Sequence, residues 1–144
     1  MYFSPGGGAT DAIVRELGQA KRRVRVQAYS FTSAPIAKAV VDARLRGLDV
    51  AVVLDSSQQT DRYSSATFLH NEGVPVFIDA AHAIAHNKLI LIDSDTVITG
   101  SFNFSRAAEE RNAENVMVLR GRLDVASNGV SSHLPFLPSE PIRN

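Results

Sequence analysis

Apolar residues along the first eighty positions follow two alternating patterns, one with the period of a helix and one typical of buried strands. The helical pattern favours two helices with Thr10 and Ser33 as N-caps, and a shorter third helix. The predicted elements are helices over 10–21, 33–47 and 65–71, and strands over 24–29, 50–54 and 74–78. Helices that alternate with strands are typical of βαβ units and a largely parallel sheet. Pro75 cannot donate to a strand ladder, which favours an edge position for the last of these strands.

A different pattern follows, in which two short apolar runs, 89–92 and 96–99, flank the turn-forming triplet Asp93-Ser94-Asp95. This arrangement predicts a hairpin of antiparallel strands. A last apolar run over 115–119 predicts one more strand. We therefore expect an α/β fold with a mixed, largely parallel sheet and helices on both of its faces, formed by one domain over residues 1–120.

Polar side chains stand at the open end of the predicted hairpin. Side chains alternate faces along a strand, so His86 and Lys88 share one face, and Ser101 and Asn103 share a face in the same way. The hairpin register would gather an imidazole, an ammonium, a hydroxyl and an amide in one patch. Such a patch suits a phosphate, because lysine supplies charge, serine and asparagine supply donors, and histidine can attack or carry a proton. Gly100 lacks a side chain, which would let backbone approach a ligand.

These residues match the phospholipase D superfamily signature, H-x-K-x4-D-x6-G-S-x-N, at every fixed position. The wider text, from A-H-N-K-L-I-L-I-D through T-G-S-F-N-F to A-E-N at 113–115, resembles the small single-motif bacterial endonucleases of that superfamily. The resemblance extends from about residue 2 to about residue 120. It implies the phospholipase D-like fold and metal-independent, cofactor-free hydrolysis of phosphodiesters in DNA, with RNA as an alternative substrate.

The resemblance also implies a role for each matching side chain. His86 would be the nucleophile that forms a phosphohistidine, and Lys88 would stabilise the charge on the phosphate. Ser101 and Asn103 would donate hydrogen bonds to the same phosphate oxygens. Glu114, in the A-E-N segment, would orient the His86 imidazole through its second ring nitrogen.

Asp93 holds a fixed position of the signature, but its place in the chain favours another role. It lies seven residues from His86, an odd number, so on a regular strand the two side chains face opposite sides. It also begins the predicted turn, where aspartate commonly accepts hydrogen bonds from nearby backbone. We therefore expect structural roles for Asp93 and for Gly100.

Composition changes this picture only slightly. The chain has 144 residues, 15 basic and 15 acidic, so a nucleic-acid-binding surface would have to be a local patch. The basic run over 21–25 is better explained as cations at the C-terminus of a helix than as such a patch. The chain lacks cysteine and lacks histidine or aspartate clusters with metal-ligand spacing, so no metal site is expected. The aromatic residues near the motifs could stack on bases, although core packing is their commoner role: Tyr29, Phe31, Phe102 and Phe104.

The segment 121–144 departs from the family pattern. Pro135, Pro138 and Pro141 oppose the amphipathic helix that usually follows the last strand, so an atypical, disordered tail is expected. Neither a signal peptide nor the roughly 20 apolar residues of a membrane span is visible, so no integral membrane association is expected. A cytoplasmic location fits, as does a periplasmic or secreted one if a signal peptide has been removed.

The signature occurs once, and no internal repeat is visible. Larger relatives carry it twice, so we expect a twofold homodimer that brings two copies of His86 into one cleft. A monomer that uses His82 or water as the general acid is the alternative. Two other functions stay open: a phospholipase D-type lipid phosphodiesterase, and a nucleic-acid-binding relic whose altered C-terminus impairs catalysis.

Overall fold

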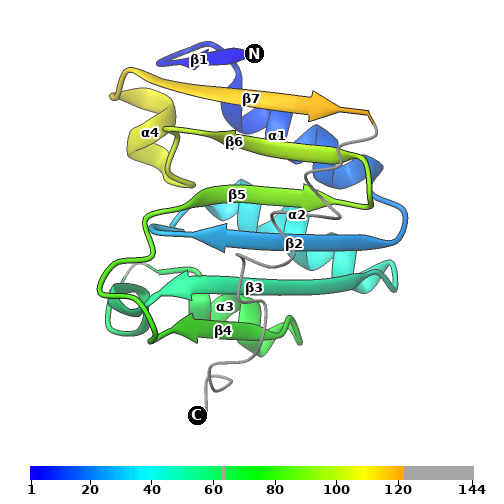
Figure 1. Ribbon diagram of the computed structural model, residues 1–144, viewed down its shortest axis with the longest axis vertical. Helices are drawn as coiled ribbons and strands as arrows, with labels where there is room; N and C mark the ends of the chain where they lie inside the picture. The colour runs from blue at the N-terminus through cyan, green and yellow to red at the C-terminus, as the bar shows by residue number, and fades with distance from the viewer. Residues whose placement is uncertain (63, 122–144) are drawn as a thin grey trace.

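The computed structural model describes residues 1–62 and 64–121, in which seven strands form one sheet with helices packed against it (Figure 1). The strands are β1 (Tyr2–Ser4), β2 (Arg23–Ala28), β3 (Asp49–Asp55), β4 (Val76–Asp79), β5 (Lys88–Ile92), β6 (Thr96–Gly100) and β7 (Glu114–Arg120). The helices are α1 (Ala9–Gln19), α2 (Ala34–Leu45), the short 3₁₀ helix η1 (Ser56–Gln59), α3 (Ala66–Asn71) and α4 (Arg106–Glu110). Every predicted helix and strand forms. β1 and η1 form in segments for which no strand or helix was predicted, and the expected disordered tail lies outside the described residues except for Gly121.

The strand order β1-β7-β6-β5-β2-β3-β4 confirms the predicted mixed α/β sheet. β4 is an edge strand, as Pro75 indicated. The expectation of a largely parallel sheet is wrong, however, since only the β2–β3 and β3–β4 pairs are parallel and the other four pairs are antiparallel. The reason is that the βαβ units extend the sheet on one side of β2 only. On its other side, the β5–β6 hairpin, β7 and β1 continue the sheet in alternating directions.

The three longer helices lie on the same face of the sheet, behind it in Figure 1. The expectation of helices on both faces is therefore wrong for α1, α2 and α3. The crossovers from β2 to β3 and from β3 to β4 add strands in the same direction along the sheet. Since crossovers of this kind share one handedness, they place their helices on the same side. α1 packs alongside α2 and extends this helical layer.

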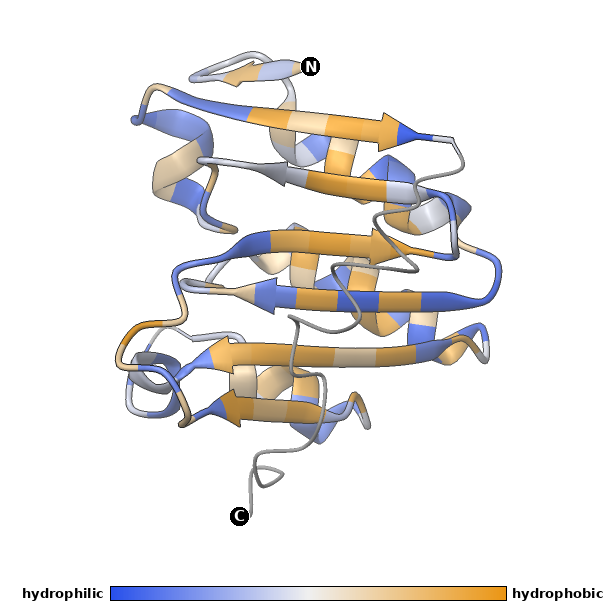
Figure 2. Ribbon diagram, viewed as in Figure 1, coloured by the Kyte–Doolittle hydropathy of each residue, from blue (hydrophilic) through white to orange (hydrophobic). Residues whose placement is uncertain are grey.

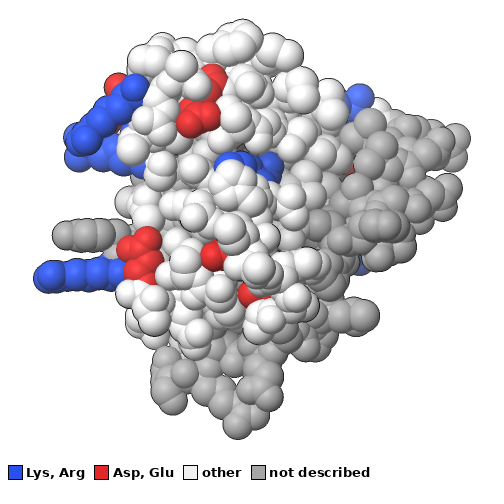
Figure 3. All heavy atoms as spheres, turned by 60° about the vertical axis from the view of Figure 1, so that its left-hand side comes forward, with Lys and Arg blue, Asp and Glu red and all other residues white. Residues whose placement is uncertain are grey.

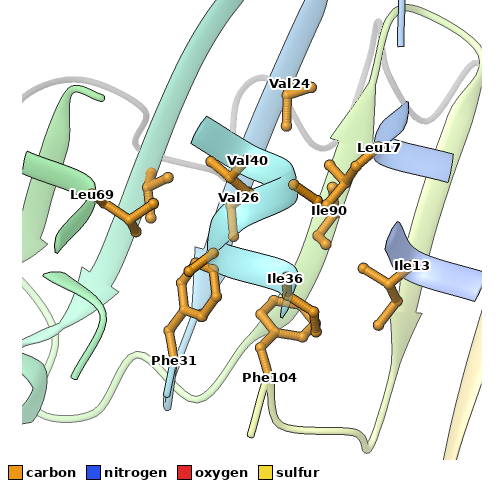
Figure 4. Packing of buried hydrophobic residues seen from close by; sticks show 14 of the residues in the cluster. Ile13, Leu17, Val24, Val26, Phe31, Ile36, Val40, Leu69, Ile90 and Phe104 are labelled. Atoms are coloured by element: carbon orange, nitrogen blue, oxygen red, sulfur yellow. The ribbon is translucent and has the colours of Figure 1, made fainter. Parts of the chain in front are cut away.

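Apolar side chains from the helices and the sheet meet in a core that reaches the end of the sheet where β2 finishes (Figure 4). In β2, apolar and polar residues alternate, so that Val24 and Val26 point into the core (Figure 2). Phe31 and Phe104 are fully buried and pack edge to face, with ring centroids 5.8 Å apart. Burying one such ring contributes about 1.5–3 kcal/mol. The core thus fixes the segments that follow β2 and β6.

The N-termini of the first two helices differ in part from the prediction. α1 begins at Ala9 with Gly8 as its N-cap, and Thr10 lies inside the first turn. The Thr10 N–H finds its acceptor in the Glu109 carboxylate of α4, at 2.8 Å, so a tertiary contact replaces the expected side-chain cap. Ser33 is the N-cap of α2, as predicted, although its side chain makes no capping hydrogen bond.

Candidate active site

One edge of the sheet collects the residues that the sequence marked as a phosphate site. β2, β3, β4 and β6 end there, whereas β5 and β7 begin there (left in Figure 1). We call it the site edge. His86 and Lys88 stand at the start of β5, and Ser101 and Asn103 follow the end of β6. In Figure 3, which brings this side forward, most of the surface carries no charge, and Lys and Arg side chains project mainly at its margin.

The segment that leads to His86 is held by two buried carboxylates that sequence reasoning missed. Asp79 accepts hydrogen bonds from the backbone N–H groups of Ala81 and His82, at 3.0 and 3.2 Å, and contacts Nδ1 of His82 at 2.9 Å. Asp55 accepts from the Ala85 N–H at 2.7 Å. These aspartates end the neighbouring parallel strands β4 and β3 and are paired across the sheet. An acidic residue directly after a buried strand was the available sequence signal.

His86 and Lys88 are in direct contact. Lys88 Nζ donates to the backbone oxygen of His86 at 2.9 Å and lies 3.1 Å from Nδ1 and 3.3 Å from Nε2 of its ring. The imidazole is exposed, whereas Lys88 is only 9% exposed. The two groups therefore form a compact pair with the ring on the solvent side, where a ligand can reach it.

The Lys88 ammonium forms no ion pair with any carboxylate among residues 1–62 and 64–121. Burial lowers the pKa of Lys88 below its ordinary value, and the negative charge of Glu114 raises it only in part. A buried ammonium without a bonded counter-ion is costly, because its neutral contacts with His86 replace the lost hydration only in part. Such a group is poised to receive an anion.

Ser101 and Asn103 differ in how free they are to bind a ligand. The Ser101 hydroxyl accepts a hydrogen bond from the backbone N–H of Asn115, at 3.1 Å, and so already helps to join β6 to β7. Asn103 Oδ1 is buried without a hydrogen-bond partner. An unpaired buried acceptor needs a donor, which a phosphate anion lacks, so a phosphate oxygen would be bound by the Nδ2 group of the Asn103 amide and not by Oδ1.

Gly100 is required by the packing of two strands. Its φ is 152°, and a Cβ atom added there would lie 2.1 Å from the backbone oxygen of Asn115. No other residue fits without moving β7 away from β6. The missing side chain thus allows the approach of a neighbouring strand, whereas the sequence suggested the approach of a ligand. The structural role expected for Gly100 is therefore to allow β6 and β7 to pair closely at this position.

Glu114, the first residue of β7, stands at the site edge but does not touch His86 in this structure. Its carboxylate accepts from Nδ2 of Asn112 at 3.4 Å. The carboxylate–imidazole contact implied by the resemblance is therefore absent from the described residues of the single chain. Glu114 acts on the site through its charge, which favours the protonated form of Lys88.

Asp93 lies at the far end of β5 from His86, in a left-handed conformation with φ of 55°. Its carboxylate accepts hydrogen bonds from the backbone N–H groups of Lys21, Arg22 and Arg23, at 3.1, 2.8 and 3.0 Å. The same contacts locate the basic run 21–25 at the end of the sheet opposite the site edge. The structure thus separates Asp93 from the other signature residues and joins it to the start of β2.

Residues 1–62 and 64–121 contain neither a candidate metal-binding cluster nor a helix that could span a membrane. No group of three or more His, Cys, Asp or Glu side chains there is arranged to hold a metal ion. In the same residues, every helix is too short or too polar to cross a bilayer.

Comparisons with known proteins point to the same family as the signature residues do. The model of the family described as "Cardiolipin synthase, PLD-like domain" matches residues 13–130. Phospholipase D from Rickettsia felis is 41% identical over 120 residues, which are 83% of this chain and 60% of the relative. A mitochondrial cardiolipin hydrolase from Chlamydomonas reinhardtii is 31% identical over 111 residues, 77% of this chain and 50% of that protein. The crystal structure of Nuc, a phospholipase D family member from Salmonella typhimurium, matches with a TM-score of 0.91 at 36% identity, covering 99% of this chain and 96% of that one.

The chain therefore belongs to the PLD-like family of the phospholipase D superfamily. The resemblance drawn from the signature is confirmed, and so is the phospholipase D-like fold. The chain spans 57–60% of the length of the Rickettsia relatives, whereas it corresponds to almost the whole chain of Nuc.

Proposed function

We propose that this protein is a phosphodiesterase that hydrolyses DNA through a covalent phosphohistidine, with RNA as a further substrate. The observation that carries the proposal is the pair at the site edge: an exposed imidazole of His86 against the buried ammonium of Lys88, which has no carboxylate partner in the described part of the chain. This pair offers a nucleophile and an anion-binding charge within one contact. A phosphate group would supply the counter-ion that Lys88 lacks.

In the proposed reaction a ring nitrogen of His86 attacks phosphorus in line. An N–P bond forms while the P–O bond to the leaving oxygen breaks, and that oxygen takes a proton from a general acid. Water then attacks the phosphohistidine, the N–P bond breaks, and the group that gave up its proton takes one from the attacking water. Lys88 holds a non-bridging oxygen in both steps, and the Asn103 amide donates to another.

The choice of DNA as substrate rests on the likeness to Nuc, which covers nearly both chains. A lipid phosphodiester is the second candidate, because several relatives are named phospholipase D or mitochondrial cardiolipin hydrolase. Both substrates present the same charged group to His86 and Lys88, so the chemistry of the pair suits either. A direct comparison of plasmid DNA with cardiolipin in detergent micelles separates them.

The general acid is assigned to His86 of a second copy of this chain. The signature occurs once, and His86 stands exposed at an edge where a second copy can approach. A twofold dimer would place both imidazoles on opposite sides of one phosphate and both Lys88 ammonium groups around it. Because two buried like charges repel, inorganic phosphate should stabilise the dimer by mass action.

Plasmid cleavage in millimolar chelator tests the reaction itself. We expect wild-type protein to keep its activity and His86→Ala to be inactive while it melts like wild type. Loss of activity in chelator, restored by one divalent metal, would rule out the phosphohistidine route as proposed.

A mixing experiment tests the shared site. Wild type mixed with inactive His86→Ala should form heterodimers, and its activity should fall below that of simple dilution. His82→Ala is the matched control, because His82 is the alternative acid: its ring is 58% exposed and bound to Asp79. A monomer with full specific activity at nanomolar concentration, inactivated by His82→Ala, would favour the single-chain mechanism instead.

A further inference from the structure

Tyr29, the residue directly after β2, contacts both members of the catalytic pair. Its ring centroid lies 4.4 Å from that of His86, with the two ring planes tilted by 54°. The Lys88 Nζ atom lies 5.3 Å from the same Tyr29 centroid. The backbone N–H of Tyr29 donates to the oxygen of Asn87 at 2.9 Å, between the two catalytic residues. The ring is therefore held against the pair by the backbone as well as by packing.

The surroundings of Tyr29 distinguish it from the other aromatic residues near the motifs. Phe31, Phe102 and Phe104 are at most 2% exposed and belong to the core. Tyr29 is only half-buried. Its ring is turned to the imidazole and the ammonium, and packing in the core does not explain why an aromatic residue stands there.

An aromatic ring suits both neighbours for a physical reason. The face of the ring carries partial negative charge, which attracts an ammonium within about 6 Å of the centroid. This attraction favours the charged form of Lys88, which burial disfavours and which the charge of Glu114 supports. The same ring restricts rotation of the exposed His86 side chain, and orientation of a nucleophile contributes strongly to rate.

We propose that Tyr29 is a positioning residue, whose ring holds the His86 imidazole in its orientation for attack and keeps the Lys88 ammonium charged and in place. The inference rests on the proposed function, since it assumes that His86 and Lys88 carry the reaction. The positioning effect comes from the Tyr29 ring and not from its hydroxyl, because the contacts with His86 and Lys88 both involve the ring.

Two substitutions separate the ring from the hydroxyl. Tyr29→Phe keeps the ring, and we expect turnover of bis(p-nitrophenyl) phosphate within about twofold of wild type. Tyr29→Leu keeps an apolar side chain over Lys88 but removes the ring face, and we expect kcat to fall roughly 10- to 100-fold with little change in KM. Tyr2→Leu is the matched control, because Tyr2 also lies under a cation, Arg15, at 5.9 Å, but on the distant strand β1.

The pH profile provides a readout that a merely structural role would not move. The titratable groups that face Lys88 are His86, Tyr29 and Glu114. Because the ring favours protonated Lys88, its removal lowers the pKa of Lys88, and the alkaline limb of the kcat profile should move to lower pH in Tyr29→Leu. The limb should stay in place in Tyr29→Phe and Tyr2→Leu.

An NMR measurement tests the same contacts without turnover. The Tyr29 ring should shift the His86 imidazole protons by its ring current, and this shift should persist in Tyr29→Phe and vanish in Tyr29→Leu. Unchanged His86 resonances, an unmoved alkaline limb, or an equal loss of kcat in Tyr29→Phe and Tyr29→Leu would each overturn the positioning role. Residual activity in His86→Ala, in contrast, would overturn the proposed function. The NMR shift would still show whether the Tyr29 ring contacts the His86 imidazole.

Discussion

Removal of the Asp93 carboxylate should destabilise the fold much more than it slows the reaction. In Asp93→Ala, three backbone N–H groups, those of residues 21–23, lose their acceptor. Hydrogen bonds to a charged group contribute about 1.5–3 kcal/mol, and water replaces part of that at this partly exposed turn. Alanine also costs about 1 kcal/mol in the left-handed conformation of φ 55°. We expect a total loss of about 3 kcal/mol, which lowers Tm by about 10 °C in a chain of this size.

The assay combines thermal unfolding with turnover per folded molecule. Asp95→Ala is the matched control, because Asp95 lies in the same turn but its carboxylate, among residues 1–62 and 64–121, accepts only from the Thr96 hydroxyl. Its effect should stay within about 0.5 kcal/mol. If Asp93→Ala melts like wild type and is nevertheless catalytically inactive, the structural role assigned to Asp93 is wrong.

The contribution of Asp93 should also depend on pH. Burial raises the pKa of Asp93, but the hydrogen bonds from the N–H groups of Arg23, Arg22 and Lys21 lower it by more than burial raises it. The pKa of Asp93 in the folded protein therefore lies below its ordinary value. A depressed folded-state pKa gives stability that is present above the unfolded pKa, about 3.9, and is lost as pH falls through the folded pKa. The difference in stability between wild type and Asp93→Asn should therefore narrow below about pH 4.

Three further substitutions test other parts of the site. Gly100→Ala should lower the free energy of unfolding by several kcal/mol in chemical denaturation, because its Cβ would lie 2.1 Å from the Asn115 oxygen. Lys88→Met should abolish turnover and yet melt at or above the wild-type temperature, because it removes a buried charge. Asp55→Asn should cost about 1–2 kcal/mol and reduce kcat, measured by melting and by steady-state kinetics, because the segment before His86 loses its anchor at Ala85.

The sequence predicted the parts of this structure that depend on local pattern. The spacing of His86 and Lys88 predicted that the two side chains would lie together, and they are in contact. Asp93 was expected to lie apart from them because of its parity, but it is its position at the other end of β5 that separates it in the structure. The turn chemistry of Asp93 was visible because aspartate in a turn binds nearby backbone, although its partners, seventy residues away, were not. Local signals fix which side of a strand a residue faces, and therefore which residues can share a site.

Features that depend on tertiary packing could not be predicted in the same way. The anchoring of the His86 segment by Asp79 and Asp55 requires that β3 and β4 be neighbours, which no single stretch reveals. The position of Tyr29 against His86 likewise depends on the pairing of β2 with β5. The placement of α1, α2 and α3 on one face follows from the strand order, which is a global property. Contacts across the sheet therefore had to come from the structure.

The covalent intermediate is the most direct test of the central claim. Wild-type protein is mixed with bis(p-nitrophenyl) phosphate in excess chelator, quenched within the first turnover, digested and examined by mass spectrometry, with His86→Ala in parallel. The account predicts a burst of p-nitrophenolate and an acid-labile p-nitrophenyl phosphoryl group on His86, absent from His86→Ala. Steady turnover by wild type with no adduct on His86, or an adduct on another residue, would contradict it.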